Sequence, residues 1–370
     1  MGQFAFIVHP MQIQQMSRRY PFLRFVPPAV LEGILRLVPP FTTSHVTGIR
    51  SEHGEAEGHF IVCPLTSRQI LTLDEDHVIS RIIAAGRAAE KLGAQIVGLG
   101  ALTAVVGEAG HRVAEALDIP VTTGNSYTVA TAIEGTRLAI DFMEYDINDI
   151  ELAVLGATGS IGQICAEIMA RDVRHLTLLG RDLVRLQALR DRILRSTGVS
   201  ARVSTDSRTV LPSCDVVISA SSSADAIVKP EDLKPGAVVC DVARPRDVSK
   251  QVAEARDDVL VIEGGVVSAP GDVDFGFDFG VPAGSCMACM AETIVLAMEG
   301  CFESYTLGRN LTVRQIEQID KMAKRHGFAL SGFRAFEREI PEEELYKIRE
   351  RATQRRTELR VSQGRASSHV

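Results

Sequence analysis

The chain contains 370 residues, of which 45% are hydrophobic and 24% charged, which is typical of about two globular domains. The net charge of −7 and the isoelectric point near 5.8 argue against nucleic-acid binding. No apolar run reaches the roughly 18 residues of a transmembrane segment, and seven scattered cysteines suit reduced thiols in a cytoplasmic protein better than a disulfide framework.

Residues 1–147 are predicted to form an amino-terminal α/β domain that binds the substrate. Apolar segments predict strands at Phe4–Val8, Ser44–Ile49, His59–Cys63, Ile96–Leu99 and Pro120–Thr122. Helical spacing of apolar residues predicts helices at Met11–Arg19, Ala29–Leu37, Asp76–Leu92 and Ala109–Leu117. Asp74 or Asp76 is the expected cap of the long helix, and Gly93 suits the position after its end. A linking helix is predicted over residues 126–145.

Residues 148–285 are predicted to form a Rossmann domain, a doubly wound parallel sheet that binds NADP. Strands are expected at Leu152–Leu155, Leu176–Leu179 and Ala201–Ser204, with helices at Ile161–Arg171 and Asp182–Ser196 between them. Three later segments read as buried parallel strands: "CDVVISASSS", "GAVVCDVARP" and "VLVIEGG".

The carboxyl-terminal part is predicted to be helical. Residues 286–330 are expected to form helices that pack back between the two domains. Residues 331–370 are highly charged, which predicts an exposed helix followed by a disordered end. Cys286 and Cys289 form one C-x-x-C pair with no second ligand pair nearby, so no metal site is predicted. The sequence leaves the oligomeric state open, and an oligomer is compatible with it.

A glycine-rich turn follows the strand Leu152–Leu155. Gly156 permits a tight turn, Gly159 lets the backbone approach a pyrophosphate, and Gly162 lets the next helix pack on the strand. The strand–turn–helix context favours dinucleotide binding at the helix start over a merely structural turn. The predicted cofactor-binding residues of this turn are Gly156, Thr158, Gly159, Ser160, Ile161 and Gly162.

The end of the second strand indicates which dinucleotide binds. An NAD site favours a carboxylate there, whereas this chain has Gly180-Arg181. A guanidinium can bind a 2′-phosphate with two hydrogen bonds, so NADPH is the predicted cofactor, with Arg185 assisting. The alternative is that Arg181 only pairs with Asp182 at the surface.

Two later loops are predicted to line the nicotinamide. The stretch "SASSS" contains Ser221 at a strand's carboxyl end, where such sheets bind ligands. "EGGVV" contains Gly264 and Gly265, where backbone could come close to the ring. Both stretches also read as ordinary strand-to-loop sequences.

Cys289 is the predicted nucleophile. It lies near the start of a predicted helix, where the helix dipole stabilises a thiolate. A thiolate beside a nicotinamide can accept an acyl group as a thioester for reduction. The alternative is a core cysteine, because the helix is apolar nearly all round. Cys286 is the weaker candidate, since it lies one turn earlier.

Several stretches together resemble the long-chain fatty acyl-(acyl-carrier-protein) reductases best known from cyanobacteria. They run in the same order over about residues 95–328: "VTTGNSYT", "AVLGATGSIG", "EGGVV", "ACMAETIVLAMEG", "LGRNLT" and "RHGF". The resemblance implies NADPH-dependent reduction of a fatty acyl thioester to a fatty aldehyde. It also implies that Cys289, in "ACxAE", accepts the acyl group from acyl carrier protein, and the departures described next make coenzyme A an alternative carrier.

Some features depart from that family or leave residue roles open. The first 95 residues match poorly and the tail after Phe328 is extra, so acyl chain length and carrier can differ. His326, Ser126 and Tyr127 are candidates for the general acid on composition alone.

Three other interpretations remain. A shikimate-dehydrogenase-like enzyme would need a lysine–aspartate pair in the first domain, where Lys91 is the lone lysine and lies at a solvated helix end. A glutamyl-tRNA-reductase-like enzyme would need its nucleophile in that domain, where Cys63 is the sole thiol. A protein that binds NADPH without chemistry would show no turnover.

Overall fold

The computed structural model describes residues 1–10, 25–223, 225–243, 245–276, 278, 280–336 and 338–367. Its contacts divide the chain into two compact units, each built from separate parts of the sequence. Unit 1 comprises residues 1–130 and 266–330, and unit 2 comprises residues 131–265 and 331–370. No helix within the described ranges has both the length and the apolar character needed to cross a bilayer.

Unit 1 contains a five-stranded sheet in the order β2-β3-β1-β4-β5, in which only β2 is antiparallel to its neighbour. The five strands are β1 (Gly2–Val8), β2 (Phe41–Ser51), β3 (Gly54–Val62), β4 (Ile96–Leu99) and β5 (Val121–Thr122). All five were predicted, although β2 and β3 are longer than expected. A small antiparallel sheet joins β12 (Val266–Ser268), β13 (Ser285–Met287) and β14 (Ala329–Leu330).

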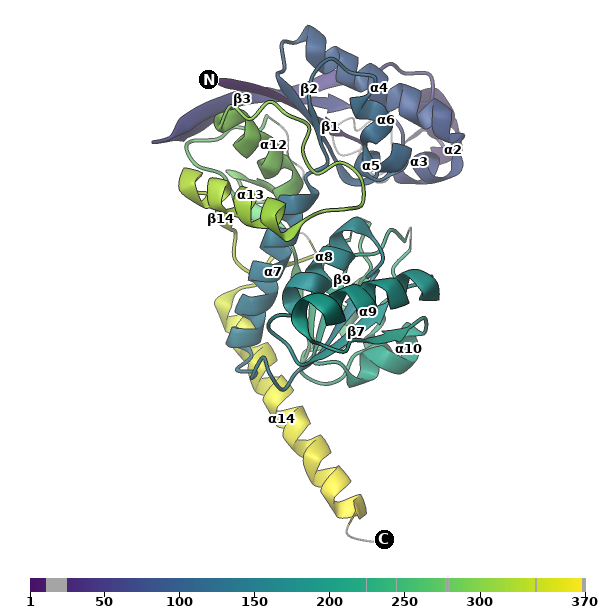
Figure 1. Cartoon of the computed structure of the whole chain (residues 1–370), viewed down its shortest axis with the longest axis vertical. Helices are drawn as coiled ribbons and strands as arrows, with labels where there is room; N and C mark the ends of the chain where they lie inside the picture. The colour runs from purple at the N-terminus through teal and green to yellow at the C-terminus, as the bar shows by residue number, and fades with distance from the viewer. Residues whose placement is uncertain are drawn as a thin grey trace. The chain divides into compact units, whose positions relative to one another are not determined.

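Helices cover both faces of the five-stranded sheet because its central strand is apolar on both sides. In β1, Ala5 and Ile7 join the core beneath α4 (Glu75–Lys91), whereas the alternate residues Phe4 and Phe6 point the other way. On that other face α12 (Ala288–Met298) packs on β1, β3 and β4. Figure 1 shows α4 and α12 on opposite sides of β1.

The other α-helices in the described part of unit 1 are α2 (Pro28–Leu35), α3 (Ser67–Thr72), α5 (Val106–Ala109), α6 (His111–Ala114) and α13 (Val313–His326). As predicted, Asp74 caps α4 by accepting a hydrogen bond from His77 N, and Gly93 follows it with a φ of 82°. The predicted helix Met11–Arg19 lies outside the described residues.

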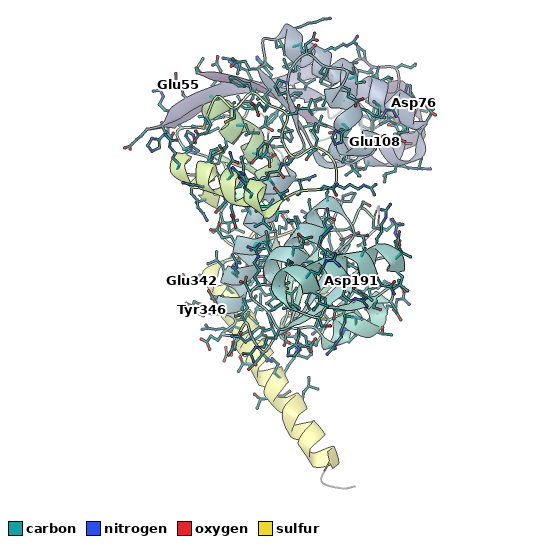
Figure 2. All side chains as sticks on the ribbon, viewed as in Figure 1. Glu55, Asp76, Glu108, Asp191, Glu342 and Tyr346 are labelled. Carbon is teal, nitrogen blue, oxygen red and sulfur yellow. The ribbon has the colours of Figure 1, made fainter. Side chains whose placement is uncertain are left out.

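The prediction of one helix over Ala109–Leu117 is wrong. Four consecutive residues, from Gly107 to Gly110, have positive φ angles of 62°, 57°, 53° and 88°, which breaks the chain into α5 and α6. Glu108, within this run, is labelled in Figure 2. The predicted helical region 286–330 also begins differently, since residues 285–287 form β13 before α12 begins.

Unit 2 contains a six-stranded sheet in the order β11-β10-β9-β6-β7-β8, and every pair of neighbours is parallel. The strands are β6 (Glu151–Leu155), β7 (His175–Leu179), β8 (Arg202–Ser204), β9 (Val216–Ser219), β10 (Val238–Asp241) and β11 (Leu260–Glu263). The first strand in sequence lies at the centre and the order reverses there, which is the doubly wound Rossmann arrangement. The predicted fold class is therefore confirmed.

The helices of this unit include α8 (Ser160–Met169) and α9 (Leu183–Thr197), which pack side by side (Figure 1). Two short helices follow, α10 (Ser207–Val210) and α11 (Lys250–Ala255). The predicted linking helix is α7 (Asn125–Phe142), and the division between the units falls inside it.

The carboxyl-terminal tail contains a helix, as predicted. After a hairpin of β15 (Arg334–Ala335) and β16 (Arg338–Glu339), helix α14 runs from Glu342 to Ser367. The helix is not fully exposed, because Leu345 and Ala352 are buried. Arg355 binds Asp258, a carboxylate with no exposed surface, so the tail is anchored to unit 2.

The observed division differs from the predicted ranges in the placement of residues 266–330. The sequence predicted these residues partly in the Rossmann domain and partly between the domains, whereas they belong to unit 1. The reason is that α12 is buried along nearly its whole length and covers one face of the unit 1 sheet.

Candidate active site

The glycine turn of unit 2 connects β6 to α8 at the point where the strand order reverses. Gly156 has a φ of 77°, and a Cβ there would lie 2.7 Å from the carbonyl oxygen of Ala220. A Cβ on Gly162 would lie 2.3 Å from the oxygen of Gly156, so the helix can approach the turn only with glycine there. Gly156 and Gly162 thus have the structural roles expected of a dinucleotide fingerprint.

Gly159 has a different setting, because a Cβ there would meet no atom closer than 3.3 Å. Its N–H donates to the oxygen of Gly156 at 2.9 Å, and it occupies the cap position of α8 without a capping side chain. A Cβ at Gly159 would therefore make a tight contact but no severe clash, so packing within the protein constrains Gly159 less than it constrains Gly156 and Gly162. The flanking Thr158, Ser160 and Ile161 are all partly exposed.

The residues after β7 separate the roles of the two predicted arginines. Asp182 caps α9 through the backbone N of Arg185 at 3.1 Å, and its carboxylate pairs with the Arg185 guanidinium at 3.3 Å. Arg181 has an exposed side chain and forms no ion pair within the described part of the chain. A Cβ on the preceding Gly180 would lie 3.5 Å from Thr158 Oγ1, so this loop adjoins the glycine turn.

The loop after β9 is held by a carboxylate that the sequence analysis did not single out. Asp247 is fully buried and accepts hydrogen bonds from Ser219 Oγ at 2.6 Å and from the N–H and hydroxyl of Ser221. The Ser221 hydroxyl is therefore engaged within the protein. Asp247 follows the predicted strand segment "GAVVCDVARP", but the local sequence gives no indication that a serine loop 26 residues earlier is its partner.

Packing within the protein and backbone conformation explain why glycine occupies the two positions after β11. A Cβ on Gly264 would lie 3.1 Å from Cys240 Sγ and 3.2 Å from Ala132 Cβ. Gly265 has a φ of 99°, which favours glycine. Close packing at Gly264 accounts for that glycine without a ligand.

Cys289 is the second residue of α12 in unit 1 and is partly exposed. Gly124, in the stretch "VTTGNSYT", lies directly against it, since a Cβ on Gly124 would be 2.3 Å from both Cys289 Cα and Cβ. The fold thereby brings together two of the family-like stretches. Cys286 lies in β13 with no exposed surface, and burial raises the pKa of its thiol.

The three candidates for a general acid have other partners. Ser126 Oγ donates to Glu292 Oε2 at 2.6 Å, and the backbone N of Tyr127 donates to the same oxygen at 2.9 Å. His326 is buried between Ser51 Oγ (2.8 Å) and Glu299 Oε1 (3.1 Å). Glu299 follows Cys289 by ten residues, about 15 Å along a helix, so His326 lies at the opposite end of α12 from the thiol.

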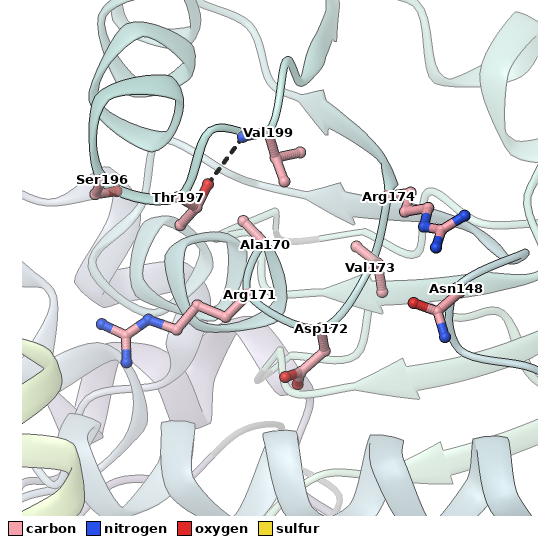
Figure 3. A pocket seen from close by; sticks show the side chains of 9 residues that line it. All are labelled: Asn148, Ala170, Arg171, Asp172, Val173, Arg174, Ser196, Thr197 and Val199. Carbon is pink, nitrogen blue, oxygen red and sulfur yellow. Dashed lines mark hydrogen bonds between the residues drawn. The ribbon is translucent and has the colours of Figure 1, made fainter.

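A hollow of about 480 Å³ in unit 2 lies away from the glycine turn (Figure 3). Its residues, among them Asn148, Val173 and Val199, precede β6, β7 and β8, so it lies at the amino ends of these strands. Doubly wound sheets bind ligands at the carboxyl ends. Among the described residues no group of three or more His, Cys, Asp or Glu side chains could hold a metal ion.

Comparison with known proteins gives partial matches. Residues 137–263 match the family model "Shikimate / quinate 5-dehydrogenase". The chain is 28% identical over 362 residues to the aminotransferase PigE of a Serratia strain, covering 94% of this chain but 42% of PigE. It is 27% identical over 309 residues to the long-chain acyl-[acyl-carrier-protein] reductase of Synechococcus elongatus, covering 79% of this chain and 86% of that protein.

A third relative is the glutamyl-tRNA reductase of Corynebacterium glutamicum, 26% identical over 55% of this chain and 44% of its own length. The segment that matches the dehydrogenase family model, residues 137–263, contains all six strands of the Rossmann sheet, whereas the chain spans less than half the length of PigE and of the glutamyl-tRNA reductase.

Proposed function

We propose that the protein reduces a long-chain fatty acyl thioester to the fatty aldehyde with NADPH, through a thioester formed on Cys289. The observation that carries this proposal is the position of Cys289, a partly exposed thiol in the first turn of α12 beside the glycine of "VTTGNSYT". The similarity to the Synechococcus acyl reductase over most of both chains supports it.

The other cysteines suit a nucleophile less well. Five of them are buried, and burial raises the pKa of Cys63 to about 12 and that of Cys214 to about 11. Cys301 is partly exposed, but burial and the nearby carboxylates of Glu299 and Glu303 raise the pKa of its thiol. Cys289 instead lies where a helix start favours a thiolate.

The proposed reaction has two stages. The Cys289 thiolate attacks the acyl carbonyl carbon, the bond from that carbon to the carrier sulfur breaks, and the carrier leaves as a thiol after taking up a proton. NADPH, when bound, supplies the hydride that reduces the new thioester. The carbon–sulfur bond to Cys289 then breaks, the aldehyde is released and the thiolate is restored.

Residues of unit 2 would hold the cofactor. The amide groups at the start of α8, next to Gly159, suit the pyrophosphate, and the exposed Arg181 suits the 2′-phosphate. Gly156 and Gly162 shape the turn, Thr158, Ser160 and Ile161 flank it, and Ser221, Gly264 and Gly265 lie in loops at the same edge of the sheet.

The shikimate-type and glutamyl-tRNA-type alternatives are less well supported by unit 1. Lys91 is exposed at the end of α4, where it cannot form a buried hydroxyl-binding pair. Cys63, the thiol of the amino-terminal segment, has no exposed surface. The family match to shikimate dehydrogenase covers the Rossmann region and leaves all of unit 1 unmatched.

The test combines turnover with detection of the covalent adduct. Purified protein is mixed with NADPH and either a long-chain acyl-(acyl-carrier-protein) or the matching acyl-CoA, and nicotinamide absorbance is followed. Without NADPH, mass spectrometry is expected to find the acyl group on the peptide containing Cys289. The Cys289→Ala variant is expected to lose at least 1,000-fold in kcat, whereas the matched Cys301→Ala variant keeps its activity.

Two results contradict the proposal. Retained turnover in Cys289→Ala would exclude the covalent route. Binding of NADPH with no reduction of either acyl thioester would favour a protein that binds the cofactor without this chemistry.

A further inference from the structure

Glu292 is a carboxylate buried inside the apolar helix α12, and the proposed reaction gives it no task. Its side chain has no exposed surface. Oε1 accepts hydrogen bonds from Thr122 Oγ1 at 2.5 Å and Thr306 Oγ1 at 2.8 Å. Oε2 accepts from Ser126 Oγ at 2.6 Å and Tyr127 N at 2.9 Å. Four donors suit an ionised carboxylate, which can only accept, and none of these donors is a cation.

The four donors come from separate parts of unit 1. Thr122 ends β5, Ser126 and Tyr127 belong to the first turn of α7, and Thr306 lies in the loop between α12 and α13. A buried charge is costly, and an apolar residue of similar volume at such a position is often no less stable. The presence of a carboxylate here therefore points to a need for defined geometry rather than for stability.

The segment that Glu292 binds is the one that contacts Cys289. Residues three apart on a helix lie on the same side, so Glu292 is one turn beyond Cys289. Between Thr122 and Ser126 lies Gly124, whose missing Cβ would be 2.3 Å from Cys289 Cα. The carboxylate thus holds the 122–127 segment directly against the backbone of Cys289.

Thr306 gives independent support, because its backbone is strained. Its φ is 53°, in the left-handed region that β-branched residues rarely adopt. Such strain persists where surrounding contacts hold it, and it is found often at functional sites. Here Glu292 binds the Thr306 hydroxyl, and Thr123 Oγ1 donates to the Thr306 carbonyl at 2.6 Å.

We propose that Glu292 is a positioning residue for Cys289. Through Thr122, Ser126 and Thr306 it fixes the glycine-containing segment against the first turn of α12, and so sets the place and direction of the thiol. It touches no reacting atom itself. The inference rests on the proposed function only in taking Cys289 as the nucleophile.

The test measures the thiol and the reaction separately. Alkylation of Cys289 by iodoacetamide is followed across pH by mass spectrometry, and kcat and KM are measured with NADPH and acyl-CoA. Glu292→Leu keeps the volume but removes all four hydrogen bonds. It is expected to lower kcat at least tenfold, with KM changed less than threefold, and to shift the midpoint of the alkylation profile to lower pH, because loss of a nearby negative charge favours the thiolate. Glu292→Gln is expected to restore at least a third of the lost kcat, since the threonine hydroxyls can turn to accept.

Control variants separate positioning from general damage. Glu299→Gln, at the other end of α12, removes a carboxylate bonded to His326 and is expected to leave both Cys289 measurements unchanged. Ser126→Ala removes one of the four hydrogen bonds with little disturbance, and a threefold fall in kcat is expected. This variant decides the question if Glu292→Leu does not fold.

Alkylation and kcat equal to wild type in folded Glu292→Leu, or in Ser126→Ala, would overturn the proposal. If the wild-type protein reduces no acyl thioester, the proposed function fails while the alkylation profiles still decide the role of Glu292.

Discussion

Arg181 and Arg185 are four residues apart, yet the structure gives them different surroundings. Arg185 pairs with the carboxylate that caps α9, whereas Arg181 is exposed beside the loop that carries Thr158. Discrimination between NADPH and NADH is therefore expected to depend mainly on Arg181, because a guanidinium held by a neighbouring carboxylate is less available to a phosphate.

The replacement Arg181→Asp tests this assignment. We expect KM for NADPH to rise at least tenfold, about 1.4 kcal/mol or more of lost binding, while KM for NADH changes less than threefold. The control Arg195→Asp makes the same charge change at the other end of α9, at another exposed arginine. An equal loss with both cofactors would show that Arg181 does not contact the 2′-phosphate.

His9 is a buried imidazole, and its lowered pKa makes the stability of the folded protein depend on pH. Its Nε2 accepts a hydrogen bond from Leu102 N at 3.2 Å, and burial lowers its pKa to about 4. The folded protein therefore holds the neutral form, whereas the unfolded chain takes up a proton near pH 6.5. This stabilisation is complete above pH 6.5 and is lost as the pH falls towards about 4.

We expect the free energy of unfolding attributable to His9 to fall by about 2 kcal/mol between pH 6.5 and 5. Denaturant unfolding of wild type and His9→Gln across this range measures it, because the difference between the two cancels the carboxylates that titrate in both. The difference in the free energy of unfolding between wild type and His9→Gln should become smaller as the pH falls. A difference that stays constant would contradict the role given to His9.

At the scale of elements, the contact between α12 and the start of α7 depends on one glycine. Gly124 has a φ of 74° and no room for a Cβ, whereas Gly300, just after α12, has a φ of 66° with nothing within 4 Å. At both positions the positive φ makes alanine unfavourable, but only at Gly124 would the alanine Cβ also clash with neighbouring atoms.

Gly124→Ala is therefore expected to cost about 2–4 kcal/mol of stability and to lower kcat at least 100-fold, since it displaces Cys289. Gly300→Ala is expected to cost about 1 kcal/mol and to leave kcat within a factor of two. Chemical unfolding and steady-state kinetics on both variants measure this. Similar effects of the two changes would mean that the Gly124 contact has no special role.

The elements themselves were largely predictable, because β1, β4, α4 and the strands of unit 2 have apolar patterns that match their period. The break at Gly107–Gly110 could not be predicted, since Glu108 and Ala109 are ordinary helix residues that their surroundings place in left-handed conformations. Cys289 and the glycine turn could be found from local sequence. The roles of Glu292 and Asp247 could not be found in this way, because their hydrogen-bond partners are up to 170 residues away and nothing in the local sequence indicates those partners.

At the scale of the whole molecule, neither unit is a continuous segment. The sheet of β1, β3 and β4 needs α12, which lies more than 150 residues further along the chain, to cover Phe4 and Phe6. The predicted first domain, residues 1–147, lacks that helix and would expose this apolar face.

A fragment of residues 1–147 is accordingly expected to bind a hydrophobic dye and to unfold without a cooperative thermal transition. The 370-residue chain serves as the control and is expected to show neither property. A sharp transition in the fragment, comparable with that of the 370-residue chain, would show that α12 is dispensable to the sheet.

The discontinuity of unit 1 also has a consequence for synthesis on the ribosome. Domains usually fold in the order in which they emerge, the amino-terminal one first. Here all six strands of the Rossmann sheet are complete once residue 263 has emerged, whereas unit 1 still lacks residues 266–330. The nascent chain must therefore carry the unfinished sheet of unit 1 while the later Rossmann sheet forms, so residues 1–130 reach their final packing after a sheet that is made later.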